Sequence, residues 1–150
     1  MSTVEFTQAL HALVRELDDA AEEVLQGDFG ITHSQLAFLM PLLSHGELDV
    51  SSLAAFKRVS IPAVSKRIKW FVDRSLIRAV HPAGDAKRVI LSLTPQGKRL
   101  ATSASGRLAS RLDELLATWP DDRRSVFHDL VLEVTWTIRA NRGLEMKELE

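Results

Sequence analysis

Apolar residues recur at three- and four-residue steps near both ends of the chain, the spacing that lines one face of a helix. Near the N-terminus this pattern predicts a helix over about residues 4–25, ended by Gly27 and Gly30. Near the C-terminus it predicts one helix over about residues 95–119 and another over about 121–141. Long amphipathic helices therefore flank a shorter middle part.

Three shorter helices are predicted in the middle part from their capping residues. Thr32 stands three residues before Gln35, the spacing of a capping box, and opens a helix over about residues 33–44. We expect Pro41 to bend this helix because its nitrogen cannot donate a hydrogen bond. The other two helices begin after residue types that favour the N-cap: residues 50–58 after Asp49, and residues 61–74 after Ser60.

The helix over residues 61–74 divides into two sides at 100° per residue. The apolar side holds Ile61, Val64, Ile68, Phe71 and Val72. The opposite side holds Pro62, Ala63, Lys66, Lys69 and Trp70, with Ser65 and Arg67 on its flanks. Such a division suits a helix in the DNA major groove, and equally an ordinary amphipathic surface helix. Trp70 either joins the basic side or packs on the segment that follows.

A β-hairpin follows this helix. The β-branched runs Ile77–His81 and Val89–Leu93 are joined by a turn-forming stretch over residues 82–87. Two short helices, a tight turn between them and a basic hairpin form the arrangement of a winged helix-turn-helix. The predicted fold class is therefore mainly α with a small β-hairpin wing, flanked by long helices.

The basic residues are concentrated in the same part of the chain. Of the 19 Lys and Arg residues, eleven lie between Lys57 and Arg99 beside only two acids, Asp73 and Asp85, although the whole chain has a net charge of −1. A basic face gains affinity for duplex DNA by releasing counterions, so we expect a DNA-binding protein. The alternative is a winged-helix module that docks its basic face on an acidic protein without sequence-specific DNA binding.

Other kinds of chemistry have little support. The chain has no cysteine, which excludes disulfides and thiolate metal sites. Its histidines show no metal-ligand spacing, and neither a nucleophile elbow nor a Gly-rich phosphate loop is present. We therefore expect no catalytic residue, no metal, no cofactor and no enzymatic activity. No signal peptide or apolar run of about 20 residues is evident, which predicts a cytoplasmic protein without a membrane partner.

An ordered series of motifs between Ile31 and Leu100 resembles the multiple antibiotic resistance regulator (MarR) family of winged-helix repressors. The matching stretches are Ile31-Thr32-His33-Ser34-Gln35, Leu53-Ala54, Val64-Ser65-Lys66-Arg67-Ile68, Phe71-Val72-Asp73-Arg74 and Leu93-Thr94-Pro95-Gln96-Gly97. The resemblance implies a homodimeric transcriptional regulator that represses a pseudo-palindromic operator. It also implies release by a small aromatic or lipophilic effector.

Two sets of residues are the expected DNA contacts. The recognition-helix set is Ser60, Pro62, Ala63, Ser65, Lys66, Arg67 and Lys69. The wing set is Asp85, Lys87 and Arg88. In the family a wing arginine enters the minor groove and the aspartate helps to hold the turn. Ala86 occupies an arginine position here, so the resemblance leaves the minor-groove role to Arg88 or, as a weaker substitute, to Lys87.

The flanking helices are expected to form a two-fold dimer, because the compact middle part cannot cover all their apolar faces. An intramolecular helical bundle is the alternative. The predicted division is dimerisation helices over 1–30 and 95–143, a DNA-binding module over 31–94, and a tail over 144–150 that is partly vector-derived. The interface candidates are Phe6, Leu10, Leu13, Leu130, Val134 and Trp136. By family analogy, the effector pocket is lined by the first helix, the helix over residues 32–44 and the helix after Thr94.

Overall fold

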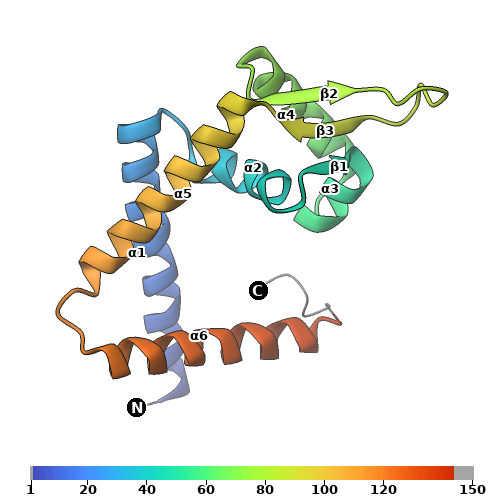
Figure 1. Ribbon diagram of the computed structural model, residues 1–150. Helices are drawn as coiled ribbons and strands as arrows, with labels where there is room; N and C mark the ends of the chain where they lie inside the picture. The colour runs from blue at the N-terminus through green and yellow to red at the C-terminus, as the bar shows by residue number, and fades with distance from the viewer. Residues whose placement is uncertain (1, 144–150) are drawn as a thin grey trace. The chain divides into compact units, whose positions relative to one another are not determined.

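The computed structural model describes residues 2–143, which divide after Ala109 into two compact units. The first unit contains α1 (Thr3–Phe29), α2 (His33–His45), β1 (Glu47–Asp49), α3 (Val50–Lys57), α4 (Ile61–Asp73), β2 (Ile77–Val80), β3 (Ile90–Leu93) and most of α5 (Pro95–Leu115) (Figure 1). The second contains the end of α5 and α6 (Asp121–Asn141). The predicted tail over 144–150 lies outside the described residues. The mainly helical fold class is confirmed.

Two helix ends differ from the prediction. Gly27 lies inside α1, which continues to Phe29 and ends at Gly30 with a φ of 65°. Burial of Leu25 and packing of Phe29 against the core outweigh the cost of about 1 kcal/mol for a glycine inside a helix. In contrast, α5 ends at Leu115, four residues before the predicted end at Trp119.

The early end of α5 follows from the packing of Trp119. The N–H of Trp119 donates to the Leu116 carbonyl in a tight turn. Its ring then meets Phe127 of α6 edge-on, with 5.6 Å between ring centroids. A continued helix would remove this turn, so packing within the second unit determines where α5 ends.

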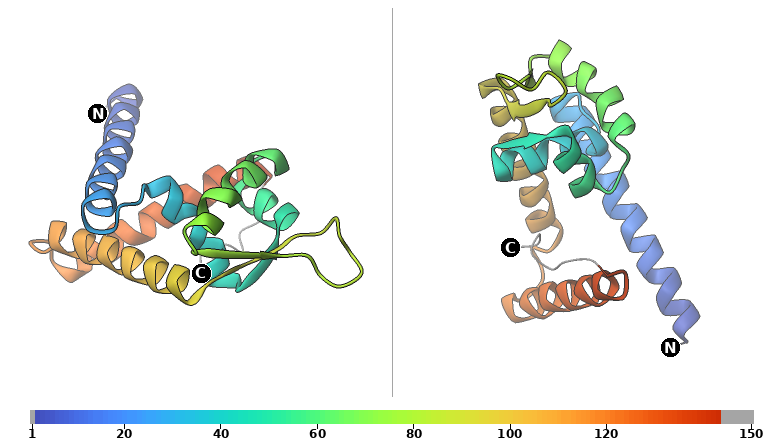
Figure 2. Two further views of the ribbon diagram at one scale, coloured as in Figure 1. Left: turned by 90° about the horizontal axis from the view of Figure 1, so that it is seen from above. Right: turned by 90° about the vertical axis from the view of Figure 1, so that its right-hand side faces the viewer.

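The sheet has three antiparallel strands in the order β1-β3-β2. The predicted hairpin is confirmed as β2 and β3, and its loop reaches beyond the helices of the first unit (Figure 2). β1 was not predicted from the sequence; it has only three residues, and Leu48 in it pairs with Leu91. β1 joins the hairpin to the N-terminal end of α3, and the wing is therefore attached to the helix-turn-helix.

The core of the first unit fixes the orientation of α4. Phe71 of α4 stacks on Phe38 of α2 with 4.5 Å between ring centroids, and Val64 is also buried. The prediction that Ile61 and Val72 also face inward is wrong, because they are 50% and 39% exposed. The buried side of α4 is thus narrower than the sequence pattern indicated, because only Val64 and Phe71 of α4 are buried.

Pro41 leaves an unpaired carbonyl in α2, and Lys57 satisfies it. Pro41 has no N–H to donate to the carbonyl of Ala37, four residues earlier. The Lys57 ammonium, from α3, donates to that carbonyl oxygen at 2.8 Å. Burial lowers the pKa of Lys57 below its ordinary value, and the nearby charge of Arg67 lowers it further. Lys57 is therefore part of the packing between α2 and α3 and not a solvated lysine.

Replacing Lys57 with methionine is expected to lower the free energy of unfolding by about 1–3 kcal/mol, because the partly buried Ala37 carbonyl loses its donor. In a Pro41→Ala background the loss should be smaller, since position 41 then supplies the N–H itself. Urea unfolding of the four proteins in this cycle measures the difference. Equal losses in both backgrounds would show that Lys57 does not act through the Ala37 carbonyl.

Candidate nucleic-acid interface

The first turns of α4 present short side chains to solvent. Ser60 caps the helix, its hydroxyl oxygen accepting the N–H of Ala63 at 3.2 Å, and Pro62 occupies the first turn. Ser60, Pro62, Ala63 and Ser65 are all exposed. Lys66 follows them, and within residues 2–143 its ammonium has no hydrogen-bond or ion-pair partner. This end of α4 can approach a polyanion closely with an unpaired cation.

The structure sets Arg67 apart from the exposed residues. Its guanidinium donates to the carbonyl and the hydroxyl of Ser34 at 3.1 and 2.9 Å, and it lies over the Phe38 ring at 5.2 Å. These contacts join α4 to α2. Lys69 is paired with Asp73 one turn later, at 2.7 Å, but its side chain stays 82% exposed. Of the predicted basic contacts on α4, Lys66 is thus the one that has no partner among residues 2–143.

Trp70 packs against the core of the first unit and does not project into solvent with the basic side chains of α4. It is partly buried, meets Phe71 edge-on at 4.9 Å, and lies under the Arg74 guanidinium at 4.0 Å. It lines a cavity of about 540 Å³ together with the end of α1, Leu76 just before β2, and the start of α5. α2 contributes no residue to the lining of this cavity.

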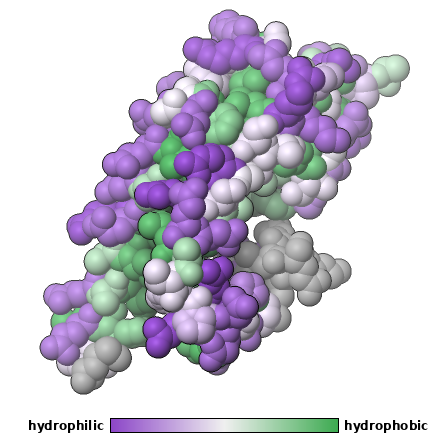
Figure 3. All heavy atoms as spheres, turned by 60° about the vertical axis from the view of Figure 1, so that its left-hand side comes forward, coloured by the Kyte–Doolittle hydropathy of each residue, from purple (hydrophilic) through white to green (hydrophobic). Residues whose placement is uncertain are grey.

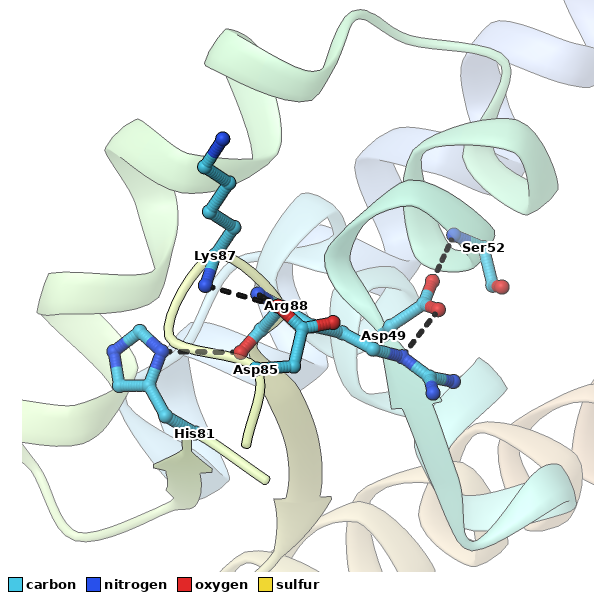
Figure 4. A network of polar contacts seen from close by, with 6 residues as sticks. All are labelled: Asp49, Ser52, His81, Asp85, Lys87 and Arg88. Atoms are coloured by element: carbon cyan, nitrogen blue, oxygen red, sulfur yellow. Dashed lines mark hydrogen bonds and ion pairs between the residues drawn. The ribbon is translucent and has the colours of Figure 1, made fainter. Parts of the chain in front are cut away.

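Asp85 holds the turn of the wing. One of its carboxylate oxygens accepts the N–H groups of Lys87 and Arg88, each at 3.1 Å (Figure 4). Gly84, just before it, has a φ of 83°, a conformation that favours glycine. On the other side of the loop, a ring nitrogen of His81 lies 3.0 Å from the carbonyl oxygen of Arg88. The backbone of the wing tip is thereby fixed by local contacts.

Arg88 is held at the base of the wing. Its Nε donates to Asp49 at 3.2 Å, and Asp49 also caps α3 by accepting the N–H of Ser52 at 2.7 Å. The Ser52 N–H holds the pKa of Asp49 below its usual value, and Arg88 contributes to the same effect. In contrast, the Lys87 side chain points away from this network, and its ammonium has no partner in the described part of the chain (Figure 4). The structure favours Lys87 as the available cation of the wing.

The described residues offer no support for other kinds of site. Between residues 2 and 143, no cluster of three or more His, Asp or Glu side chains could hold a metal ion. Over the same residues, no helix combines the length and the apolar character needed to cross a membrane.

Comparisons with known proteins agree with this geometry. The profile of the MarR family matches residues 31–89. An HTH-type transcriptional regulator of Mycobacterium leprae is 30% identical over 108 residues, which are 69% of this chain and 75% of the relative.

Two solved structures share the fold. FabT of Streptococcus pneumoniae, solved in complex with DNA, has a TM-score of 0.82 at 12% identity, covering 93% of this chain and 99% of FabT. NadR, solved with 4-hydroxyphenylacetate, has a TM-score of 0.62 at 23% identity, covering 88% and 90% of the two chains. At these identities the likeness is one of fold. Together with the matching profile and the Mycobacterium leprae relative, it shows that the chain belongs to the MarR family of winged-helix transcriptional regulators, which bind DNA and are not enzymes.

Proposed function

We propose that the protein is a homodimeric repressor that places the N-terminal half of α4 in the major groove of a pseudo-palindromic operator. The observation that carries the proposal is the exposed start of α4, where four short side chains precede Lys66, which has no partner in the described part of the chain. Short side chains let a helix approach the base edges, and a lysine can donate to the acceptors of guanine. Pro62 and Ala63 offer apolar contact to thymine methyl groups.

The wing supplies a second contact. The Asp85 turn fixes the backbone at the tip, and Lys87 projects from it without a partner within residues 2–143. A cation on a fixed loop suits the phosphates or the narrow minor groove beside the major-groove site. Asp85 fixes the position of the loop, and Arg88 ties the base of the wing to Asp49.

The exposed apolar faces of α1 and α6 support a dimer. On α1 these residues include Phe6, Leu10 and Leu13, which are 39–45% exposed. On α6 they include Leu130, Val134 and Trp136, which are 37–54% exposed. Apolar surface also lies open among polar side chains on the face in Figure 3. Such surface favours association. A two-fold dimer would present two α4 helices to half-sites about 10 bp apart.

The repressor role and the response to an effector rest on the family and on geometry. A dimer bound across two half-sites occupies the duplex and excludes polymerase from it. NadR has been solved with 4-hydroxyphenylacetate, a small aromatic acid, which supports an effector of that general kind here. We place this activity in the cytoplasm, where the operator is accessible.

The test is selection from a random DNA pool followed by footprinting on the recovered sequence. We expect a two-fold consensus with half-sites about one helical turn apart. Binding that weakens steeply with salt but yields no consensus would reduce the claim to nonspecific DNA binding. No consensus and no footprint would instead favour the alternative, a module that uses its basic face on an acidic partner.

We expect substitutions of the two wing cations, Lys87 and Arg88, to change the salt dependence of DNA binding differently. Lys87→Ala should lower the slope of log K against log salt by about one for each subunit, because one phosphate contact is lost. Arg88→Gln should change this slope less, since Arg88 is already paired with Asp49. Fluorescence anisotropy of labelled operator at several salt concentrations measures both slopes. A larger change for Arg88→Gln would assign the DNA contact to Arg88.

A further inference from the structure

Arg58, in the turn between α3 and α4, adopts a backbone conformation that normally belongs to glycine. Its φ is 54° and its ψ is 42°, in the left-handed region, where the Cβ of an L-residue lies too close to the following carbonyl oxygen. Its N–H donates to the carbonyl of Ala55 at 3.1 Å, and the N–H of Val59 donates to that of Ala54 at 3.0 Å. These two hydrogen bonds form a Schellman motif, which favours glycine at the position of Arg58.

No contact of the Arg58 side chain offsets this strain within residues 2–143. Over these residues its guanidinium has no hydrogen-bond, ion-pair or aromatic partner, and Arg58 is exposed. The cation that packs inside the fold is the neighbouring Lys57, which donates to the Ala37 carbonyl. Strained residues of this kind cluster at functional sites. The arginine at position 58 therefore points to a contact with another molecule.

Arg58 lies at one end of the surface proposed to meet DNA. Residues 58–63 are exposed without interruption, and the last three of them are the start of α4. In a helix-turn-helix the recognition helix enters the major groove while the preceding helix crosses the DNA backbone. The turn that joins them therefore lies over phosphates that border the groove. A planar guanidinium can donate two parallel hydrogen bonds to one phosphate.

We propose that Arg58 binds a phosphate of duplex DNA from the turn between α3 and α4, and that this contact is kept at the expense of fold stability. A phosphate contact carries no base information, so Arg58 adds affinity for any duplex and no preference for the operator. The position of the contact rests on the proposed placement of α4, but its effect is measurable on DNA of any sequence. Replacing Arg58 with glycine should change stability and DNA affinity in opposite directions.

Arg58→Gly and Arg58→Gln separate the backbone from the side chain. Glycine relieves the left-handed strain and removes the charge, whereas glutamine removes the charge and keeps the strain. We expect Arg58→Gly to move the midpoint of urea unfolding to higher urea and Arg58→Gln to leave it nearly unchanged. Both should weaken binding to the selected operator and to a scrambled duplex by the same factor, about tenfold, because a dimer loses two phosphate contacts. The slope of log K against log salt should fall by about one for each subunit.

Ser75→Gly is the matched control at the other end of α4. Ser75 has a φ of 55° and sits in the same motif, since its N–H donates to the Val72 carbonyl and the N–H of Leu76 donates to that of Phe71. Its side chain carries no charge. Ser75→Gly should therefore raise the urea midpoint, as Arg58→Gly does, and leave DNA affinity and its salt slope unchanged.

Fluorescence anisotropy of both labelled duplexes at several salt concentrations measures the affinities and slopes. Unchanged affinity in both Arg58 variants would overturn the phosphate contact. A loss confined to the operator would also overturn it, because Arg58 would then contact a base. A lower urea midpoint for Arg58→Gly would show that the left-handed backbone is not a source of strain. If the unchanged chain selected no consensus, the proposed function would fail, whereas titrations of the scrambled duplex would still decide the role of Arg58.

Discussion

A Gly97→Ala substitution is expected to lower the free energy of unfolding by about 3 kcal/mol or more, or to prevent folding. A Cβ at position 97 would lie 1.9 Å from the carbonyl oxygen of Leu76 and 2.8 Å from its carbonyl carbon. Both atoms belong to backbone, so no side-chain rotation can relieve the overlap. Urea unfolding followed by circular dichroism measures the loss.

The cost is large because the Leu76 carbonyl joins β2 to α5. It accepts the N–H of Thr94 at 3.1 Å, and the Thr94 hydroxyl also donates to it at 3.3 Å. The same hydroxyl accepts the N–H of Gly97 at 3.0 Å and so caps α5. Moving Gly97 away from Leu76 would disturb all three contacts together.

Gly106→Ala is the matched control on the same helix. A Cβ there meets nothing within 4 Å, so the change should raise stability by up to about 1 kcal/mol, the helix preference of alanine over glycine. If Gly97→Ala and Gly106→Ala behaved alike, close approach to Leu76 would not be the reason for glycine at position 97.

Features that depend on neighbouring residues could be predicted from the sequence. Thr32, Asp49 and Ser60 were expected to cap helices, and each accepts the N–H three residues later. A cap needs only the local chain, and its sequence signal is correspondingly specific. The ends of α1 and α5 were misplaced because tertiary packing, at Phe29 and at Trp119, decided them.

Contacts between residues far apart in the chain could not be predicted from the sequence. The pair Arg88–Asp49 is separated by 39 positions and depends on the pairing of β1 with β3. The pair Arg67–Ser34 is separated by 33 positions and depends on how α4 lies against α2. A partial signal existed for Lys57, because a proline inside a helix always leaves the carbonyl four residues earlier without its donor. The sequence therefore indicates that a donor is needed at Ala37, and only the fold shows which residue supplies it.

For the same reason, the basic residues of α4 that are available to contact DNA differ from those expected from the sequence. From the sequence, Lys66, Arg67 and Lys69 are all among the expected DNA contacts of one helix. The structure distinguishes them, since Arg67 binds Ser34 and Lys69 is paired with Asp73. This difference makes the three positions unequal in their expected effect on DNA binding.

Lys66→Ala is expected to weaken operator binding by about 100-fold or more, because a dimer loses the contact twice and each base contact is worth about 1–3 kcal/mol. Lys69→Ala is the matched control, with the same charge change one turn along α4, and should weaken binding only a few-fold.

Anisotropy titrations of the selected operator and a scrambled duplex, at one salt concentration, separate base from phosphate contacts. Lys66→Ala should lower the preference for operator over scrambled DNA, whereas Lys69→Ala should leave that preference nearly unchanged. An equal loss on both duplexes would make Lys66 a phosphate contact. An unchanged footprint would mean that α4 is not the helix that reads the operator.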